Sequence, residues 1–224
     1  MKKTSTVFLS PEGDWTKLGD ASVLRLNELS PLILYIEYIF PHFTLLSDKE
    51  RMTHLKHIRD TDNLFNTAWY NNRKEVDSEE KRCAAKFIAA LKQLPCLLRD
   101  GEPKPVSNFC DPSEPIFAVF LTDDNFPPDH VTDTKWLSFF RKIGLRTTAT
   151  KEEFVTFCSR IADGNQRNIL DSSKILMEYL FKNVNWHNEA EFLTIVSEIP
   201  FVCAETLKDL HWIVPVANLS LIHI

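Results

Sequence analysis

Glycine is scarce in this sequence of 224 residues, which contains only five: Gly13, Gly19, Gly101, Gly144 and Gly164. An average chain of this length carries roughly fifteen. No two of the five are spaced as GxG, GxxG or GxxxxGK. Loops that wrap phosphate groups need closely spaced glycines for their backbone freedom, so the sequence argues against a dinucleotide-binding fold and against a P-loop NTPase.

An excess of basic residues is also missing. The chain has 26 Lys and Arg against 31 Asp and Glu, and a formal net charge of -5. Its densest basic stretch, residues 51–59, is flanked on both sides by acidic residues. This pattern predicts a solvated helix face rather than a track for phosphates. Because nucleic-acid-binding proteins usually carry a basic excess or stripe, we expect no nucleic-acid partner.

Sequence motifs of nucleophilic and metal-dependent catalysis are absent. The chain contains no GxSxG or HExxH, so we predict no catalytic residue, no cofactor and no enzymatic activity. Glu50, His54 and His57 share one helical face, but no further strong ligand lies at short spacing. A structural zinc site usually has four protein ligands and a catalytic one three, so this triplet predicts a surface helix rather than a metal site.

The cysteines predict a reducing compartment. There are five, an odd number, without a CxxC pair, and several lie in apolar runs. Free cysteine packs like a small hydrophobic residue, so we expect reduced core thiols in a cytoplasmic protein. One alternative stays open, because a cysteine and a histidine that are distant in sequence can form a catalytic site in three dimensions.

Neither a signal peptide nor a membrane span is predicted. The N-terminal segment has too few apolar residues for a signal peptide. The longest apolar stretch, residues 31–46, is too short to cross a bilayer and includes Glu37. We therefore expect no membrane insertion. The chain ends on the apolar segment 218–224 without a polar tail, which leads us to expect a fragment of a longer polypeptide.

Most of the chain is predicted to be helical. Ser47–Glu50 and Thr150–Glu153 are capping boxes, and Gly144 and Gly164 mark helix ends. Pro41 is expected to end the regular part of the first helix. Apolar residues recur at helical spacing in the stretches 29–43, 83–94, 136–143, 154–161, 169–184 and 192–199.

Short strands recur in a similar setting at three places. Apolar segments begin at Val7, Cys96 and Phe201, and each is followed by a second strand that ends in Asp or Asn, one residue, then Ser. The second copy turns at Asp100-Gly101, a frequent hairpin signal. The third copy is expected to contain a short helix at residues 205–210 and to return at residues 213–216.

This pattern predicts an α+β fold, mostly helical with short β-hairpins or a small antiparallel sheet, in two similar units. We place one unit at residues 1–112 and the other at residues 113–224. A chance recurrence of turn residues is the alternative to a true repeat. Phe126-Pro-Pro128, in a polar loop, is either a plug that folds back on the core or a docking edge.

Several strings in the middle of the chain resemble a known family. They are Leu94–Ser107 (LPCLLRDGEPKPVS), Phe109–Pro112 (FCDP), Phe126–Pro128 (FPP), Trp136–Leu145 (WLSFFRKIGL) and Thr150–Phe154 (TKEEF). They are similar to the internal-repeat region of the sacsin family, giant cytoplasmic proteins related to chaperones. The resemblance implies a co-chaperone that works with the seventy-kilodalton heat-shock machinery.

The resemblance does not extend to an ATP site. In this family each large repeat opens with an ATPase-like domain of the gyrase and heat-shock-ninety kind. Its signature is an acidic residue on a helix, a nearby Asn and then a DxGxG turn, and this sequence lacks that turn; Asp163-Gly164-Asn165 is predicted as a helix end. The resemblance thus implies a non-catalytic structural and interaction segment. Its expected partners are chaperone proteins and other segments of the same chain, and its self-association is left open.

Overall fold

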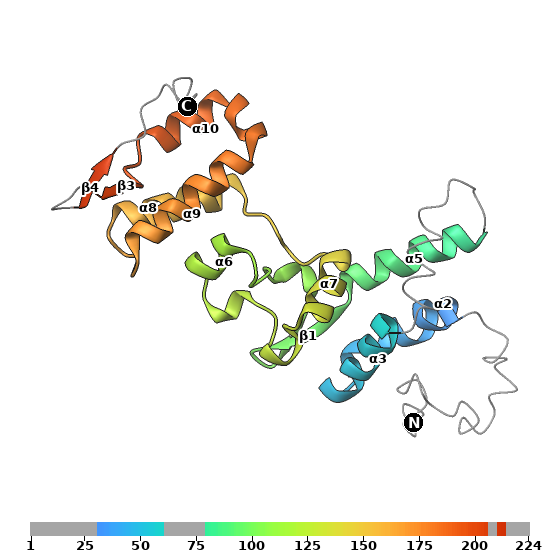
Figure 1. Ribbon diagram of the computed structural model, residues 1–224. Coiled ribbons are helices and arrows are strands. Elements are labelled where there is room, and N and C mark those ends of the chain that lie inside the picture. The colour runs from blue at the N-terminus through green and yellow to red at the C-terminus, as the bar shows by residue number, and fades with distance from the viewer. Residues whose placement is uncertain (1–30, 61–78, 206–209, 214–224) are drawn as a thin grey trace, which may run out of the picture. The chain divides into compact units, whose positions relative to one another are not determined.

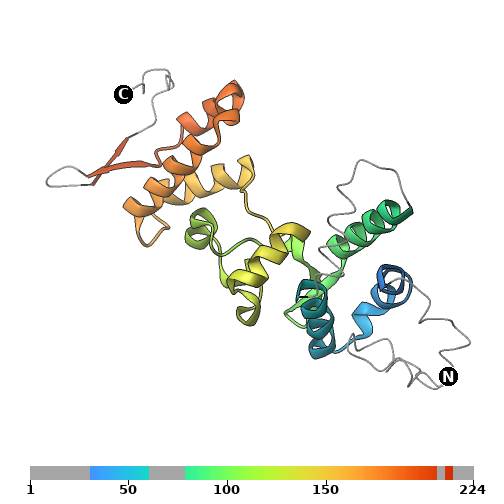
Figure 2. The same ribbon diagram turned by 45° about the vertical axis from the view of Figure 1, so that its right-hand side comes forward.

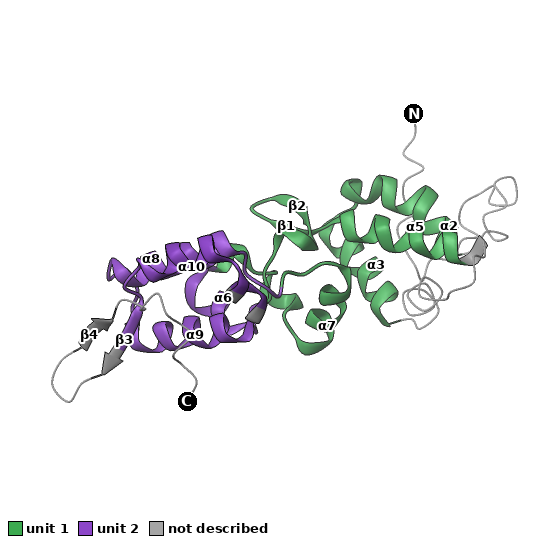
Figure 3. Cartoon of the chain, turned by 90° about the horizontal axis from the view of Figure 1, so that it is seen from above, with its two compact units in different colours: residues 1–111, 123–146 green, residues 112–122, 147–224 purple. Residues whose placement is uncertain are grey.

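The computed structural model describes residues 31–60, 79–205 and 210–213. The chain divides into two compact units, coloured separately in Figure 3. Unit 1 contains residues 1–111 and 123–146, and unit 2 contains residues 112–122 and 147–224. The chain thus enters unit 2, returns to unit 1 and enters unit 2 again. The first crossing lies one residue from the predicted boundary, and the separation into domains 1–112 and 113–224 stays a prediction.

Unit 1 combines helices with one hairpin (Figure 1); η denotes a 3-10 or π helix. Its described elements are α2 (Pro31–Leu34), η4 (Tyr35–Ile39), η5 (Phe40–Leu45), α3 (Asp48–Asp60), α5 (Glu79–Gln93), β1 (Pro95–Arg99), β2 (Glu102–Pro105), η7 (Val106–Asn108), η8 (Asp123–Asn125), η9 (Asp129–Val131) and α7 (Thr134–Ile143).

Unit 2 is built mainly of helices, and α8, α9 and α10 lie close together in both views (Figure 1 and Figure 2). Its described elements are α6 (Pro115–Phe120), α8 (Lys151–Ala162), α9 (Ile169–Lys182), η10 (Val184–Asn188), α10 (Ala190–Ser197), β3 (Val202–Glu205) and β4 (Leu210–Ile213).

The first helical stretch changes its winding before the predicted break at Pro41. One α-turn is followed by the π-helix η4 and then by the 3-10 helix η5, which contains Pro41 near its start. Proline has no N–H to donate to the carbonyl four residues earlier, so a regular α-helix cannot continue through it. The change of winding keeps Tyr35, Ile39 and Phe43 buried.

Both predicted capping boxes are confirmed. The Glu50 N–H donates to Ser47 Oγ (3.4 Å), and the Ser47 N–H donates to Glu50 Oε2 (2.9 Å). At the start of α8, the Glu153 N–H donates to Thr150 Oγ1 (3.2 Å), and the Thr150 N–H donates to Glu153 Oε2 (2.9 Å). Each box satisfies backbone donors that have no partner within the helix.

The hairpin predicted at Asp100-Gly101 is confirmed. Strands β1 and β2 pair antiparallel, with Arg99 opposite Glu102. Asp100 has a φ of 57° and Gly101 a φ of 81°. A two-residue turn with positive φ at both positions matches the right-handed twist of the strands, and Asp-Gly is among the few sequences that tolerate it.

The C-terminal hairpin differs from its prediction. Strands β3 and β4 pair from Val202 opposite Ile213 to Glu205 opposite Leu210. The helix expected at residues 205–210 is therefore wrong at both of its ends, and the return strand begins at Leu210 instead of Ile213. The residues between the two strands lack a turn signal, and this favoured the prediction of a helix over that of a hairpin. The hairpin predicted at residues 7–22 lies outside the described residues, so the similarity of the two units stays a prediction.

Aromatic rings fill the core of unit 1. Tyr35 lies 5.5 Å from Phe40 and 6.1 Å from Phe87, measured between ring centroids, and Phe40 lies 5.4 Å from Phe87. These rings belong to η4, η5 and α5 and are buried, as is Phe43 beside them. The first helical stretch and α5 are thus joined by aromatic packing of the kind that adds to simple area burial.

In unit 2 one fully buried ring, that of Phe154, is the centre of the core. Its centroid lies within 5.6 to 6.2 Å of the rings of Tyr179, Trp186, Phe192 and Phe201. These partners come from α9, η10, α10 and the residue before β3. A single side chain of α8 therefore connects most of the elements of this unit.

The predicted fold class, mostly helical α+β with short antiparallel hairpins, is confirmed. Among the described helices, none combines the length and apolar character that a membrane crossing requires.

Candidate functional site

The basic stretch 51–59, predicted as a solvated helix face, lies within α3 (Asp48–Asp60), and this prediction is partly wrong because the helix also has a buried face. Within α3, Arg51 and His54 are buried together with Leu55 and Ile58. The acidic flanks in the sequence suggested that this basic face is solvated, whereas the i, i+3, i+4, i+7 spacing of these four residues defines a stripe that faces the core.

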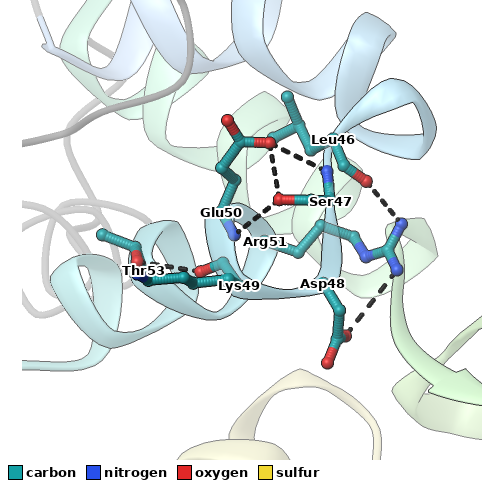
Figure 4. Close-up of polar contacts among 7 residues, drawn as sticks. All are labelled: Leu46, Ser47, Asp48, Lys49, Glu50, Arg51 and Thr53. Atoms are coloured by element: carbon teal, nitrogen blue, oxygen red, sulfur yellow. Dashed lines mark hydrogen bonds and ion pairs between the residues drawn. The ribbon is translucent and has the colours of Figure 1, made fainter.

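Glu50, His54 and His57 do not form a metal site. The Glu50 carboxylate accepts hydrogen bonds from the Ser47 N–H (2.9 Å) and the Ser47 hydroxyl (2.7 Å), shown in Figure 4. The hydroxyl bond, followed by the backbone bond, lowers the pKa of Glu50. His54 is fully buried, with Nδ1 3.1 Å from the Tyr35 hydroxyl. Across the described residues, no group of three potential ligands could hold a metal ion.

The Tyr35–His54 pair is a buried polar contact inside the aromatic core. Besides the hydrogen bond, the two rings meet edge to face with centroids 5.7 Å apart. Burial raises the pKa of Tyr35 well above its usual value, so the phenol stays protonated. A protonated phenol can donate to an unprotonated Nδ1, which joins η4 to α3.

Arg51 supports the chain entry into α3. Its Nη1 donates to the Leu46 carbonyl (2.9 Å), and its Nη2 lies 3.7 Å from Asp48 Oδ1 (Figure 4). The Arg51 side chain is 94% buried, and its Nε has no hydrogen-bond partner among the described residues. The Arg51 guanidinium therefore stabilises the turn at Leu46.

The cysteine side chains do not form an evident nucleophilic site. None of the five, all of them among the described residues, is in a disulfide bond; Cys96, Cys110 and Cys158 are buried, and Cys83 and Cys203 are half-buried. Burial raises the pKa of Cys96 to about 12, and burial also raises the pKa of Cys158. Since the thiolate is the reactive form, these two thiols are unsuited to nucleophilic attack near neutral pH.

The FCDP string identified in the sequence forms a buried junction in unit 1. Asp111 is fully buried, and its Oδ2 accepts a hydrogen bond from Arg141 Nε at 2.5 Å. The Asp111 N–H donates to the Arg146 carbonyl (2.8 Å), and the Cys110 N–H donates to the Asn125 carbonyl (2.8 Å). The string thus ties together three segments that are separate in the sequence.

Two polar side chains in unit 2 have a comparable role at the end of α6. Arg160 Nη1 donates to the Phe120 carbonyl (2.7 Å), and Gln166 Nε2 donates to the Val119 carbonyl (2.9 Å). Carbonyls in the last turn of a helix lack intrahelical partners, so these side chains satisfy them.

The loop segment Phe126-Pro-Pro128 is partly buried. Pro127 is buried, while Phe126 and Pro128 are half-buried. The Phe126 N–H donates to the Asp123 carbonyl (3.1 Å) and closes the preceding turn. This placement is closer to the plug interpretation than to a fully exposed docking edge.

An open groove of about 430 Å³ lies in unit 1 between the end of α3 and α7. Arg59 and Asp60 form its α3 side, and α7 contributes Lys135 and Lys142. Thr134, Ser138 and Phe139 complete the lining. Three cationic side chains face one carboxylate, so the lining has a formal charge of +2 in a chain whose net charge is -5.

The α3 side of this groove is fixed by two contacts of Arg59. Its Nε and Nη2 donate to the two oxygens of Asp60 at 2.6 and 2.8 Å. Its guanidinium carbon lies 4.0 Å from the centroid of the Trp136 ring, a cation–π arrangement. The hydrogen bonds with Arg59 lower the pKa of Asp60, and the charges of nearby lysines add to this effect.

Our sequence analysis missed this groove. The signal that was available is the spacing of Lys135, Ser138 and Lys142, which places them on one face of a helix that buries its apolar residues on the other. Their relation to Arg59 depends on tertiary packing and has no counterpart in the sequence pattern.

Comparison with known proteins gives one informative similarity. The chain is 22% identical to human sacsin over 227 residues, which covers 91% of this chain and 5% of sacsin. The chain therefore spans about a twentieth of the length of this relative. No family model matches the chain, and no solved structure matches it. The similarity indicates a sacsin-like region.

Proposed function

We propose that this chain is a non-catalytic structural and protein-interaction segment of a sacsin-like co-chaperone. In this proposal it acts in the cytoplasm, together with the seventy-kilodalton heat-shock machinery and with other segments of the same long chain. The similarity to human sacsin along 91% of the chain is the observation on which the proposal depends.

The use of polar side chains as partners for other protein groups supports a structural role. Arg51, Arg160 and Gln166 each donate to a backbone carbonyl, and Asp111 accepts from Arg141. These side chains give hydrogen-bond partners to backbone groups at turns and helix ends. Burying such backbone groups without a partner costs free energy. They are not arranged as an acid, a base and a nucleophile around a common cavity.

The state of the cysteines argues against the alternative of an enzyme with a Cys–His site. The raised pKa values of Cys96 and Cys158 disfavour their thiolate forms. The fully buried His54 has Nδ1 paired with the Tyr35 hydroxyl rather than with a thiol. Cys83 and Cys203 are half-buried and are the more accessible thiols for an enzymatic alternative.

A binding and turnover experiment tests the proposal. The purified chain is immobilised, and binding of a purified seventy-kilodalton heat-shock protein is measured by biolayer interferometry with and without ATP. ATP hydrolysis by the chain alone is measured in parallel. We expect saturable protein binding without hydrolysis. Turnover of ATP, or micromolar ATP binding in the absence of any protein binding, would contradict the proposal.

A further inference from the structure

We propose that the buried pair of His54 and Tyr35 makes unit 1 sensitive to acid, so that protonation of His54 loosens the packing of η4 on α3. This inference goes beyond the proposed interaction function and does not depend on it. It is argued from the burial of the pair, its hydrogen bond and the charged groups around it.

His54 lies in the interior of unit 1, where α3 meets the first helical stretch. Its side chain is fully buried. The centroid of its ring lies 5.7 Å from that of Tyr35 in η4 and 6.2 Å from that of Phe43 in η5. A charge in such surroundings loses its solvation by water, so the neutral imidazole is the form that this core favours.

The hydrogen bond with Tyr35 favours the same form. Nδ1 of His54 lies 3.1 Å from the Tyr35 hydroxyl. Burial raises the pKa of Tyr35 well above its usual value, so the hydroxyl keeps its proton and can donate it to an unprotonated Nδ1. A proton on Nδ1 opposes the phenol proton, which must then turn away and lose this acceptor inside the core.

Two charged groups near His54 belong to α3 itself. Arg51, one turn earlier, is a buried cation and opposes a further positive charge. Glu50, four residues earlier, attracts it, but this carboxylate is half-buried and already accepts from the Ser47 N–H and hydroxyl. The charge of His54 is a smaller cause of the lowered pKa of Glu50 than either of these hydrogen bonds. Glu50 therefore offers a weak counter-charge to an imidazolium.

The other elements packed here contribute groups that stay uncharged. Tyr35 of η4 remains a phenol, and Phe43 of η5 is apolar. Strand β1 packs on α3 and carries Cys96, whose pKa burial raises to about 12, so its thiol keeps its proton at neutral and acidic pH.

The direction and the range of the effect follow from linkage. In an unfolded chain a histidine gains its proton near pH 6.5, at about its ordinary value. A fold that favours neutral His54 has its full stability above this pH and loses stability as the pH falls below it. Each pH unit below that value then raises the opening constant of unit 1 by about tenfold while the folded ring stays neutral. Glu50 and Asp60, whose pKa values are lowered from 4.5 and 3.8, respond in a separate and more acidic range.

Hydrogen exchange of the amides of α3, detected by mass spectrometry, tests the inference. It is measured from about pH 7.5 to about pH 5.5, on either side of the ordinary histidine value, and is corrected for the intrinsic pH dependence of amide exchange. The variant is His54→Gln, which cannot become charged. The matched control is His42→Gln, the same replacement at an exposed position of η5 in the same unit.

We expect the opening constant of α3 in the unaltered chain to rise about tenfold as the pH is lowered by one unit below the ordinary histidine value. The control should keep this rise, whereas His54→Gln should reduce it to about twofold or less, whatever its stability at neutral pH. Two results would overturn the inference: no rise in the unaltered chain, or the same rise in His54→Gln as in the control.

A second measurement on the unaltered chain covers the case in which His54→Gln does not fold. Nitrogen NMR of the histidine rings distinguishes a neutral imidazole from an imidazolium. We expect Nδ1 of His54 to stay unprotonated for as long as the amides of α3 remain protected from exchange. An imidazolium at His54 in a chain that is still folded overturns the inference. Neither measurement involves the heat-shock protein or ATP, so failure here leaves the proposed function standing, and the reverse also holds.

Discussion

Replacing Arg141 with methionine should destabilise unit 1 because it removes a cation that donates to a buried carboxylate. Asp111 is completely buried, and Arg141 Nε donates to it at 2.5 Å. Removal of one partner of a fully buried pair costs about 3–5 kcal/mol. The Arg141 side chain is 40% exposed, and water reaching the vacated side reduces the expected cost to about 2–3 kcal/mol.

The matched control is Arg99→Met, in the same unit. Arg99 pairs with Asp124 at 2.9 Å, but the Asp124 side chain is 76% exposed and stays hydrated when its partner is removed. Exposed ion pairs contribute about 0–1 kcal/mol. The two variants make the same chemical change, so their difference isolates the burial of the carboxylate.

Hydrogen exchange detected by mass spectrometry is the appropriate assay. A chain with two compact units does not guarantee two-state unfolding, whereas exchange gives a free energy of opening for each unit. The double variant Asp111→Asn/Arg141→Met should recover part of the loss, because the buried charge is then removed. If the two Arg→Met variants differ by less than about 0.5 kcal/mol in unit 1, the reasoning about the buried carboxylate is wrong.

Three further predictions follow from the cores, the thiols and the helix caps. Phe154→Ala should cost about 3–5 kcal/mol in unit 2, measured by exchange; a loss shared equally by unit 1 would contradict a local core. Iodoacetamide should modify Cys83 well before Cys96 in the native state, by mass spectrometry, and equal rates would show that burial does not protect Cys96. The pKa of Glu50 is lowered below its ordinary 4.5 in the folded state, so its contribution to stability is present above 4.5 and is lost as the pH falls through the folded value. Ser47→Ala should therefore make acid unfolding less steep, and an unchanged pH profile would refute this role of the cap.

Features that depend on a few neighbouring residues could be predicted from the sequence. The Ser47 and Thr150 capping boxes and the Asp100-Gly101 turn each use bonds or dihedral angles set within four residues. The same local logic failed between residues 205 and 210, where the residues lacked a turn signal and the pairing of β3 with β4 decided the structure.

Features that depend on tertiary packing could not be predicted. The acidic neighbours of His54 indicated a solvated helix, yet its side chain is buried against Tyr35. Arg59 and Lys135 are far apart in the sequence and share a groove only because α3 and α7 pack in the same unit. The partner of Asp111 was equally hidden, since thirty residues separate it from Arg141.

The interleaved path of the chain sets an order for its biosynthesis. Residues 112–122 belong to unit 2, although they are translated before residues 123–146 of unit 1. The nascent polypeptide therefore cannot complete unit 1 until residue 146 has emerged from the ribosome. Asp111 is translated thirty residues before Arg141, its hydrogen-bond donor. A stop codon between residues 112 and 146 would leave unit 1 incomplete, and a protease cut in this range would separate segments that belong to the same unit.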